Sequence, residues 1–156
     1  MDLKQLYQDI ILEHGKSPRN LGKCKEYNHD AKGYNPLCGD KVHVYLKLDK
    51  KKKVESLTFE GEGCAISLAS ASIMTELVKG KSLNEAKDIM GAFLNMIKNN
   101  SKIKFNYLNE DEITKLMSLS GVKQFPMRVK CATLSWHTLI SALEGNKKEI
   151  NTEVID

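Results

Sequence analysis

Three cysteines that lie far apart in the chain place the strongest constraint on its fold. Cys38 precedes Asp40 by one glycine, in a loop that follows an Asn-Pro sequence. Cys64 follows a Gly-Glu-Gly sequence, and Cys131 follows an Arg-Val-Lys sequence. Three thiolates and one carboxylate make a full tetrahedral set for a zinc-sized ion. A fold that holds one ion with these side chains must bring a loop and two distant segments together, and we expect them to meet at one end of a sheet.

The N-terminal half of the chain predicts one helix followed by a β-hairpin. Apolar side chains recur at helical spacing over residues 2–13, and His14-Gly15 and Pro18 are expected to end that helix. A polar, turn-rich stretch follows, with one short strand near Tyr27. Alternating apolar and polar side chains then predict the two strands of an antiparallel hairpin, at residues 42–48 and 54–60.

The C-terminal half predicts only helices and loops. Helices are expected to start at Cys64 or Ala65, at Ser82 and at Asn109, and a last one is expected at 130–143 after a loop at 121–129. Ser82 with Glu85, three residues on, forms the pattern of a capping box. Residues 99–109 are predicted to be a polar linker.

This order of elements indicates an α+β fold, in which helices pack on one face of a small antiparallel sheet of about three strands. We expect a single domain over residues 1–145. Residues 146–156 form a polar C-terminal tail, which is expected to fray.

The amino-acid composition of the chain argues against a nucleic-acid or membrane partner. The 156 residues carry a net charge of +4, and Arg19 and Arg128 are the only arginines. Proteins that read nucleic acids usually depend on arginine and interleaved aromatic residues. No apolar run approaches the roughly 20 residues of a membrane span, and residues 1–5 carry no apolar signal segment. We therefore expect no nucleic-acid partner, no membrane partner and a cytoplasmic location.

The cysteine contexts favour ligands or catalysts over disulfides, since a reducing compartment keeps thiols free. Cys64 falls at the start of a predicted helix, where free N–H groups stabilise a thiolate. Cys131 is also expected at a helix start. The positive charges of Arg128 and Lys130 nearby are expected to lower the pKa of its thiol. Small cysteines also pack in cores, so packing stays open as an alternative. Cys24 has no comparable context, and we interpret it as a bystander.

Four segments, distributed along nearly the whole chain, carry specific motifs: residues 6–20 (LYQDIILEHGKSPRN), 35–40 (NPLCGD), 59–72 (FEGEGCAISLASAS) and 121–136 (GVKQFPMRVKCATLSW). In these motifs the chain resembles the U-type iron–sulfur assembly family, which has the IscU/NifU N-terminal fold. Within this family, two features make the chain resemble the SufU branch. Lys130 stands where IscU-type scaffolds have a histidine, and roughly residues 99–120 form an extra segment before the last cysteine.

The resemblance implies a SufE/IscU-like fold and a zinc-dependent sulfurtransferase. A cysteine desulfurase, SufS-like in this branch, forms a persulfide and hands its outer sulfur to Cys38, the catalytic residue. A histidine of the desulfurase takes over a zinc position and releases Cys38. The sulfur then passes to a downstream iron–sulfur assembly scaffold. Arg128 and Lys130 are expected to stabilise the persulfide or to dock the partner. The implied Zn²⁺ ligands are Cys38, Asp40, Cys64 and Cys131.

The main alternative is a scaffold on which a transient [2Fe–2S] cluster is assembled, with the same three cysteines as ligands. Lys130 argues against it, because lysine is a poor iron ligand at neutral pH, although Asp40 can complete the set. A purely structural zinc domain is a third possibility. Closed structural sites usually pair their cysteines as CxxC, and this chain has no such pair.

Overall fold

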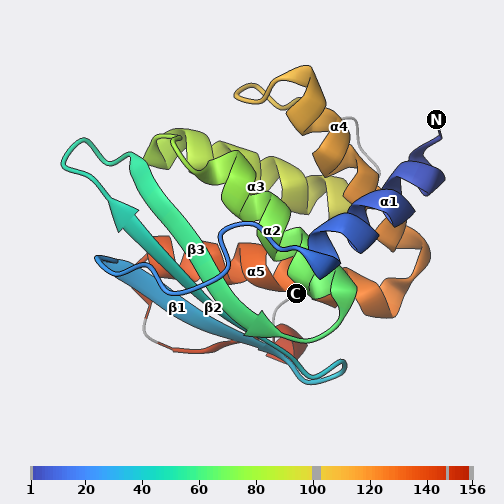
Figure 1. Cartoon of the computed structure of the whole chain (residues 1–156), viewed down its shortest axis with the longest axis horizontal. Coiled ribbons are helices and arrows are strands. Elements are labelled where there is room, and N and C mark those ends of the chain that lie inside the picture. Colours follow the sequence, from blue (N-terminus) through green and yellow to red (C-terminus); the bar gives the residue numbers. More distant parts are fainter. Residues whose placement is uncertain (1, 100–102, 147, 155–156) are drawn as a thin grey trace.

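Four strands form one sheet in the order β3-β2-β1-β4 (Figure 1). The computed structural model describes residues 2–99, 103–146 and 148–154. β1–β2 and β2–β3 are antiparallel pairs, whereas β4 runs parallel to β1. The predicted hairpin is therefore confirmed, and its strands are slightly longer than the alternation indicated. The strands are β1 (His29–Asn35), β2 (Asp40–Leu48), β3 (Val54–Glu62) and β4 (Ile150–Asn151).

The helices cover one face of the sheet in two layers, which confirms the α+β prediction (Figure 1). α2 and α5 contact the strands, α1 and α4 pack on α2, and α3 packs on α5. Among the residues that the structure describes, none of the helices combines the length and the apolar character of a membrane span. The helices are α1 (Leu3–Lys16), α2 (Ala65–Val78), α3 (Leu83–Lys98), α4 (Glu110–Ser118) and α5 (Pro126–Leu143), with short 3₁₀ helices η1 (Leu119–Gln124) and η2 (Thr152–Val154).

The helix starts follow capping chemistry that is readable in the sequence. The predicted capping box at α3 is confirmed: Ser82 Oγ accepts from the Glu85 N–H, and Glu85 Oε1 accepts from the Ser82 N–H. Asn109 and Glu112 form the same reciprocal pair at α4. Each box satisfies backbone N–H groups that a helix leaves without partners, and so fixes where the helix begins.

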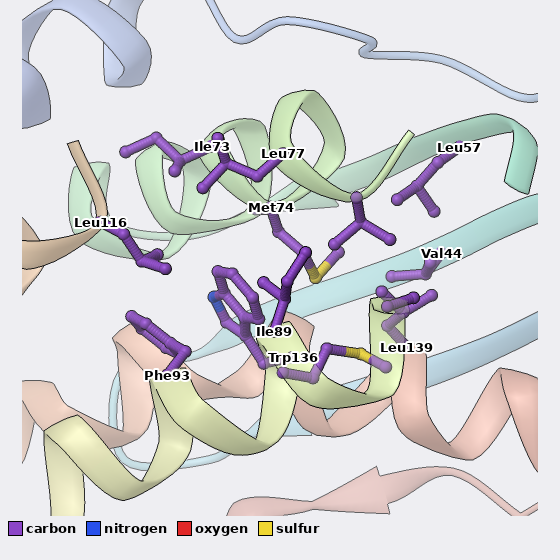
Figure 2. Close-up of a cluster of buried hydrophobic side chains, with 14 of the residues drawn as sticks. Val44, Leu57, Ile73, Met74, Leu77, Ile89, Phe93, Leu116, Trp136 and Leu139 are labelled. Atoms are coloured by element: carbon purple, nitrogen blue, oxygen red, sulfur yellow. The ribbon is translucent and has the colours of Figure 1, made fainter. Parts of the chain in front are cut away.

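The centre of the core is an aromatic stack between α3 and α5. The rings of Phe93 and Trp136 lie 4.1 Å apart at an interplanar angle of 20°, and aliphatic side chains from α2 and the sheet surround them (Figure 2). The Trp136 indole N–H donates to Ser70 Oγ at 2.9 Å. The one polar atom of the indole is thus satisfied, and α5 is tied to α2 as well as to α3.

Two boundaries in the N-terminal part differ from the local signals. α1 passes through His14-Gly15 and ends at Lys16, two residues before Pro18, which was also expected to end it. His14 is buried, and its Nδ1 lies 2.7 Å from Ser72 Oγ, so the contact with α2 keeps the last turn helical. The short strand lies at His29–Asn35 and not near Tyr27, because its edge pairs with β2 from His29 onward.

The last helix starts earlier than predicted. Residues 121–129 are not a loop: η1 runs to Gln124, and α5 begins at Pro126. Proline suits the first helical position, because its φ is already helical and no N–H is needed there. Cys131 therefore lies more than one turn inside α5, and the expectation that it sits at a helix start is wrong.

The C-terminal tail is ordered against the sheet where the structure describes it. Gly33 pairs with Ile150 and Tyr34 with Asn151, so the expectation of fraying is wrong for residues 150–154. Parts of the predicted 99–109 linker and of the tail, namely 100–102, 147 and 155–156, lie outside the described residues, as does residue 1.

The buried stack predicts a large stability effect at α3. Phe93→Ala is expected to lower the free energy of unfolding by about 3–5 kcal/mol, because it removes a fully buried ring and leaves a cavity beside Trp136. Urea denaturation followed by circular dichroism measures this. Phe125→Ala is the matched control: Phe125 is 51% exposed, so its loss is expected to cost about 0.5 kcal/mol. Equal costs for the two variants would contradict the assignment of the core.

Candidate metal and sulfur site

The sequence-predicted site residues come from three separate parts of the chain. Cys38 lies in the turn between β1 and β2, and Asp40 is the first residue of β2. Cys64 is the N-cap of α2, directly after β3. Cys131 lies on α5, which packs against β1 and β2. A loop and two distant segments therefore meet at one end of the sheet as expected, although Cys131 comes from the second turn of α5 and not from a helix start.

Cys38, Asp40 and Cys131 form a compact group. Their ligand atoms all lie within 4.8 Å of one another, and the sulfurs of Cys38 and Cys131 are 3.2 Å apart. Cys64 is not a member of this group in the described residues, although its backbone N–H donates to Asp40 Oδ1 beside the group. A site with four ligands therefore requires the Cys64 thiol to move closer to the other three.

Asp40 is the fixed point of the site, and its side chain is fully buried. Its Oδ1 accepts from the backbone N–H of Cys64 at 2.9 Å, and its Oδ2 accepts from Asn35 Nδ2 at 3.0 Å. Buried carboxylates need such donors, because an unpartnered one is strongly disfavoured away from water. The two hydrogen bonds join the start of α2 and the end of β1 to the same carboxylate.

A polar chain extends this contact to the C-terminus. Asn35 Nδ2 also lies 3.4 Å from Cys131 Sγ, and Asn35 Oδ1 accepts from the Thr152 hydroxyl at 2.9 Å. Sequence reasoning assigned no role to Asn35 or Thr152. The position of Asn35 in the Asn-Pro-Leu-Cys-Gly-Asp motif was a usable signal, whereas nothing in the polar tail pointed to Thr152.

Gly63 allows β3 and α2 to join beside Asp40. Its φ is +145°, a region that side chains rarely adopt. A Cβ at this position would lie 2.9 Å from Asp40 Cα and would collide with the Asp40 carboxylate. Glycine at this position therefore lets the backbone approach Asp40 closely.

The thiols differ in acidity in the metal-free chain. The pKa of Cys64 is lowered to about 6, first by a hydrogen bond to Cys131 and then by backbone N–H groups in the first turn of α2. The pKa of Cys131 is raised, because it shares its proton with Cys64 and is buried. A thiolate at Cys64 and a protonated thiol at Cys131 are the consistent pair of states near neutral pH.

Arg128 and Lys130 point to different places. Arg128 Nη1 lies 3.6 Å from Cys38 Sγ, and hydrogen bonding to Cys131 together with the charge of Cys38 raises the pKa of Arg128. Lys130 Nζ instead pairs with Glu153 Oε1 at 2.9 Å. The structure therefore brings Arg128 to the site, whereas Lys130 contacts the C-terminal tail.

The remaining candidates lie elsewhere. Cys24 is half-buried in the segment before β1. None of the histidines belongs to the ligand group found among the described residues. His43 bonds Asp30 and Tyr45 on the sheet, and His14 bonds Ser72.

The donor set fits zinc. Zn–S bonds of about 2.3 Å in a tetrahedron place ligand atoms roughly 3.8 Å apart. That spacing falls within the 4.8 Å that encloses the atoms of Cys38, Asp40 and Cys131. Thiolate sulfur with one carboxylate oxygen is a combination that zinc accepts, and Asn35 supplies the outer hydrogen bonds that orient such ligands.

Comparison with known proteins adds a family match. The NifU-like N terminal domain model matches residues 6–132. The chain is 40% identical over 138 residues to the zinc-dependent sulfurtransferase SufU of Bacillus subtilis, covering 88% of this chain and 89% of that one. It is 36% identical over 142 residues to the iron–sulfur cluster assembly scaffold protein IscU of Streptococcus pyogenes, covering 91% and 85%.

A solved structure is similar along the same length. The crystal structure of FiSufU, a SUF-system protein of Fervidobacterium islandicum AW-1, superposes with a TM-score of 0.78 at 34% sequence identity. The superposition covers 89% of this chain and 97% of that one. The fold is therefore similar over almost all of FiSufU.

Gly63→Ala is expected to weaken zinc binding at least about 10-fold, because the new methyl group displaces the Asp40 carboxylate. Competition with a chromophoric chelator measures the affinity. Gly80→Ala is the matched control: Gly80 also has a positive φ, +87°, but a Cβ there meets nothing within 4 Å. Equal losses in both variants would assign the effect to backbone strain and not to Asp40.

The thiol acidities predict an order of reactivity. A thiolate is the nucleophile, and its fraction rises as pH rises through the pKa. In the metal-free chain, alkylation of Cys64 by iodoacetamide is expected to reach half its plateau rate at about pH 6. Cys131 is expected to react far more slowly throughout. Peptide mass spectrometry across pH 5–9 measures both rates, and preferential labelling of Cys131 would contradict the assignment.

Proposed function

Because the chain belongs to the NifU-like N terminal domain family, we propose that it is a zinc-dependent sulfurtransferase that accepts persulfide sulfur at Cys38 and passes it on for iron–sulfur cluster assembly. The donor is a cysteine desulfurase of the SufS type. The recipient is a downstream assembly scaffold, and both act in the cytoplasm. The observation that carries the proposal is the half-exposed Cys38 thiol beside the Arg128 guanidinium, within a group of metal-ligand atoms.

Cys38, Asp40, Cys64 and Cys131 are the proposed zinc ligands. When bound, zinc keeps its thiolate ligands deprotonated and is itself redox-silent. The chain contributes the rest. Asn35 and the Cys64 N–H hold Asp40 in place, and the buried Cys131 anchors the inner side of the site. Of the three cysteines, only Cys38 lies in an interstrand turn, which suits it to meet a partner.

The transfer is an exchange between sulfur atoms. The Cys38 thiolate attacks the outer sulfur of the donor persulfide, a new S–S bond forms on Cys38, and the donor S–S bond breaks. The donor cysteine leaves as a thiolate, so the sulfur atom moves without net oxidation or reduction. The Arg128 guanidinium lies 3.6 Å from Cys38 Sγ, where its positive charge is placed to pair with the anionic persulfide.

The surroundings of Cys38 suit a protein donor better than a small molecule. Leu37 is 51% exposed beside it, and Phe125 and Met127, just before Arg128, are 51% and 64% exposed. Exposed apolar side chains near a reactive group are typical of a protein contact surface. These residues are expected to take part in docking the desulfurase.

The second candidate is a scaffold for a [2Fe–2S] cluster, and the IscU relatives favour it. The cluster would be cargo held by the same cysteines with Asp40. Lys130 offers no help as a ligand here, since its Nζ pairs with Glu153. Anaerobic reconstitution with iron and sulfide separates the two candidates. A stable visible absorption from a cluster, with no sulfur acceptance when iron is excluded, would favour the scaffold.

Cys38→Ala is expected to abolish sulfur acceptance while the chain stays folded, because the attacking thiolate is lost. The zinc-loaded protein is incubated with desulfurase and cysteine without iron, and mass spectrometry identifies any cysteine with one added sulfur. Cys24→Ala is the matched control and is expected to accept sulfur as the unaltered chain does. Full acceptance by the Cys38 variant, or none by the unaltered chain with a matched desulfurase, would overturn the proposal.

A further inference from the structure

The C-terminal segment reaches the metal-ligand group from the far end of the chain. β4 pairs with β1 at Gly33–Ile150 and Tyr34–Asn151, and the next residue, Thr152, is buried at 3% exposure. Its hydroxyl donates to Asn35 Oδ1 at 2.9 Å. A polar tail residue that is buried and hydrogen-bonded next to a fully buried amide needs an explanation, since nothing in the transfer chemistry uses it.

The hydrogen bond of Thr152 fixes which way the Asn35 amide faces. On its other side, Asn35 has two acceptors, Asp40 Oδ2 at 3.0 Å and Cys131 Sγ at 3.4 Å. In both contacts Asn35 Nδ2 is the donor, so the amide NH₂ faces Asp40 and Cys131. The amide oxygen is then directed away from the site, and a hydroxyl donor is the group that satisfies it.

We propose that Thr152 and Asn35 are positioning residues of the metal site: the Thr152 hydroxyl holds the Asn35 amide in the one orientation that orients both Asp40 and Cys131. This inference rests on the proposed zinc site and adds the C-terminal segment to it. Without the hydroxyl, the flipped amide would place its oxygen against the Asp40 carboxylate. Outer contacts of this kind typically contribute 10–100-fold to metal affinity.

Other contacts hold the segment in place without Thr152. Lys130 Nζ pairs with Glu153 Oε1 at 2.9 Å, and Asn151 Oδ1 accepts from the Glu153 N–H at 2.9 Å. The two β4 pairings add backbone hydrogen bonding. Removing the hydroxyl alone therefore tests its effect on Asn35 and not the docking of the tail.

The experiment measures zinc affinity in the full chain, by competition with a chromophoric chelator, for Thr152→Val and Thr152→Ser. Valine keeps the shape and loses the hydroxyl, whereas serine keeps the hydroxyl. Thr138→Val is the matched control, because Thr138 is a buried threonine of α5 whose hydroxyl donates to Leu134 O within its own helix. Absorption of the Co²⁺-substituted proteins reports ligand geometry, and thermal unfolding of the metal-free proteins reports stability.

Thr152→Val is expected to bind zinc about 10-fold more weakly and to change the Co²⁺ spectrum, with Thr152→Ser and Thr138→Val close to the unaltered chain. Because Thr152 acts through Asn35, adding Thr152→Val to Asn35→Ala is expected to cause no further loss.

Three results would overturn the inference. The first is unchanged zinc affinity in Thr152→Val, and the second is an equal loss in Thr138→Val, which would indicate general destabilisation. The third is an additive loss in the double variant. Failure of the unaltered chain to bind zinc is a separate result, because it would remove the proposed site itself and the inference with it.

Discussion

The burial of one carboxylate organises this end of the molecule. Asp40 is fully buried, and an ionised group without water needs donors from the protein. The backbone N–H of Cys64 and the amide of Asn35 supply them. To do so, the start of α2 has to lie against the start of β2, which in turn requires a glycine at position 63. Satisfying this carboxylate therefore brings the start of α2, with Cys64, to the turn that carries Cys38.

The site has a fixed inner side and an open outer side. Asp40 and Cys131 are buried and tied to β1 and α5, whose packing depends on the Phe93–Trp136 stack and the sheet. Cys38 and Arg128 lie at the surface, beside exposed apolar side chains. A rigid ligand platform next to one accessible thiol is the arrangement that the proposed transfer needs, since only the thiol that meets the partner has to change its bonding.

Much of the architecture was predictable because it follows from local chemistry. The alternation of apolar and polar side chains predicts the hairpin. Capping residues that bond the backbone of their own helix predict the starts of α3 and α4. Errors arose where a distant segment overrides the local signal. α1 continues past Gly15 because His14 bonds Ser72 on α2. The position of β1 is set by its pairing with β2. The local sequence around Pro126 predicts a loop, although proline is equally suited to open a helix, and Cys131 therefore lies deeper in α5 than expected.

By itself, the sequence determined the set of chemical groups: the cysteines, the aspartate, the glycines beside them and the order of elements that carries them. Those features depend on side-chain identity and on neighbours a few residues away. Only the tertiary structure decided that Cys64 stands beside the ligand group, that Lys130 pairs with the tail while Arg128 contacts Cys38, and that Thr152 bonds Asn35. These contacts join residues separated by much of the chain, and hydrogen bonds across such distances exist only once the sheet and helices have packed.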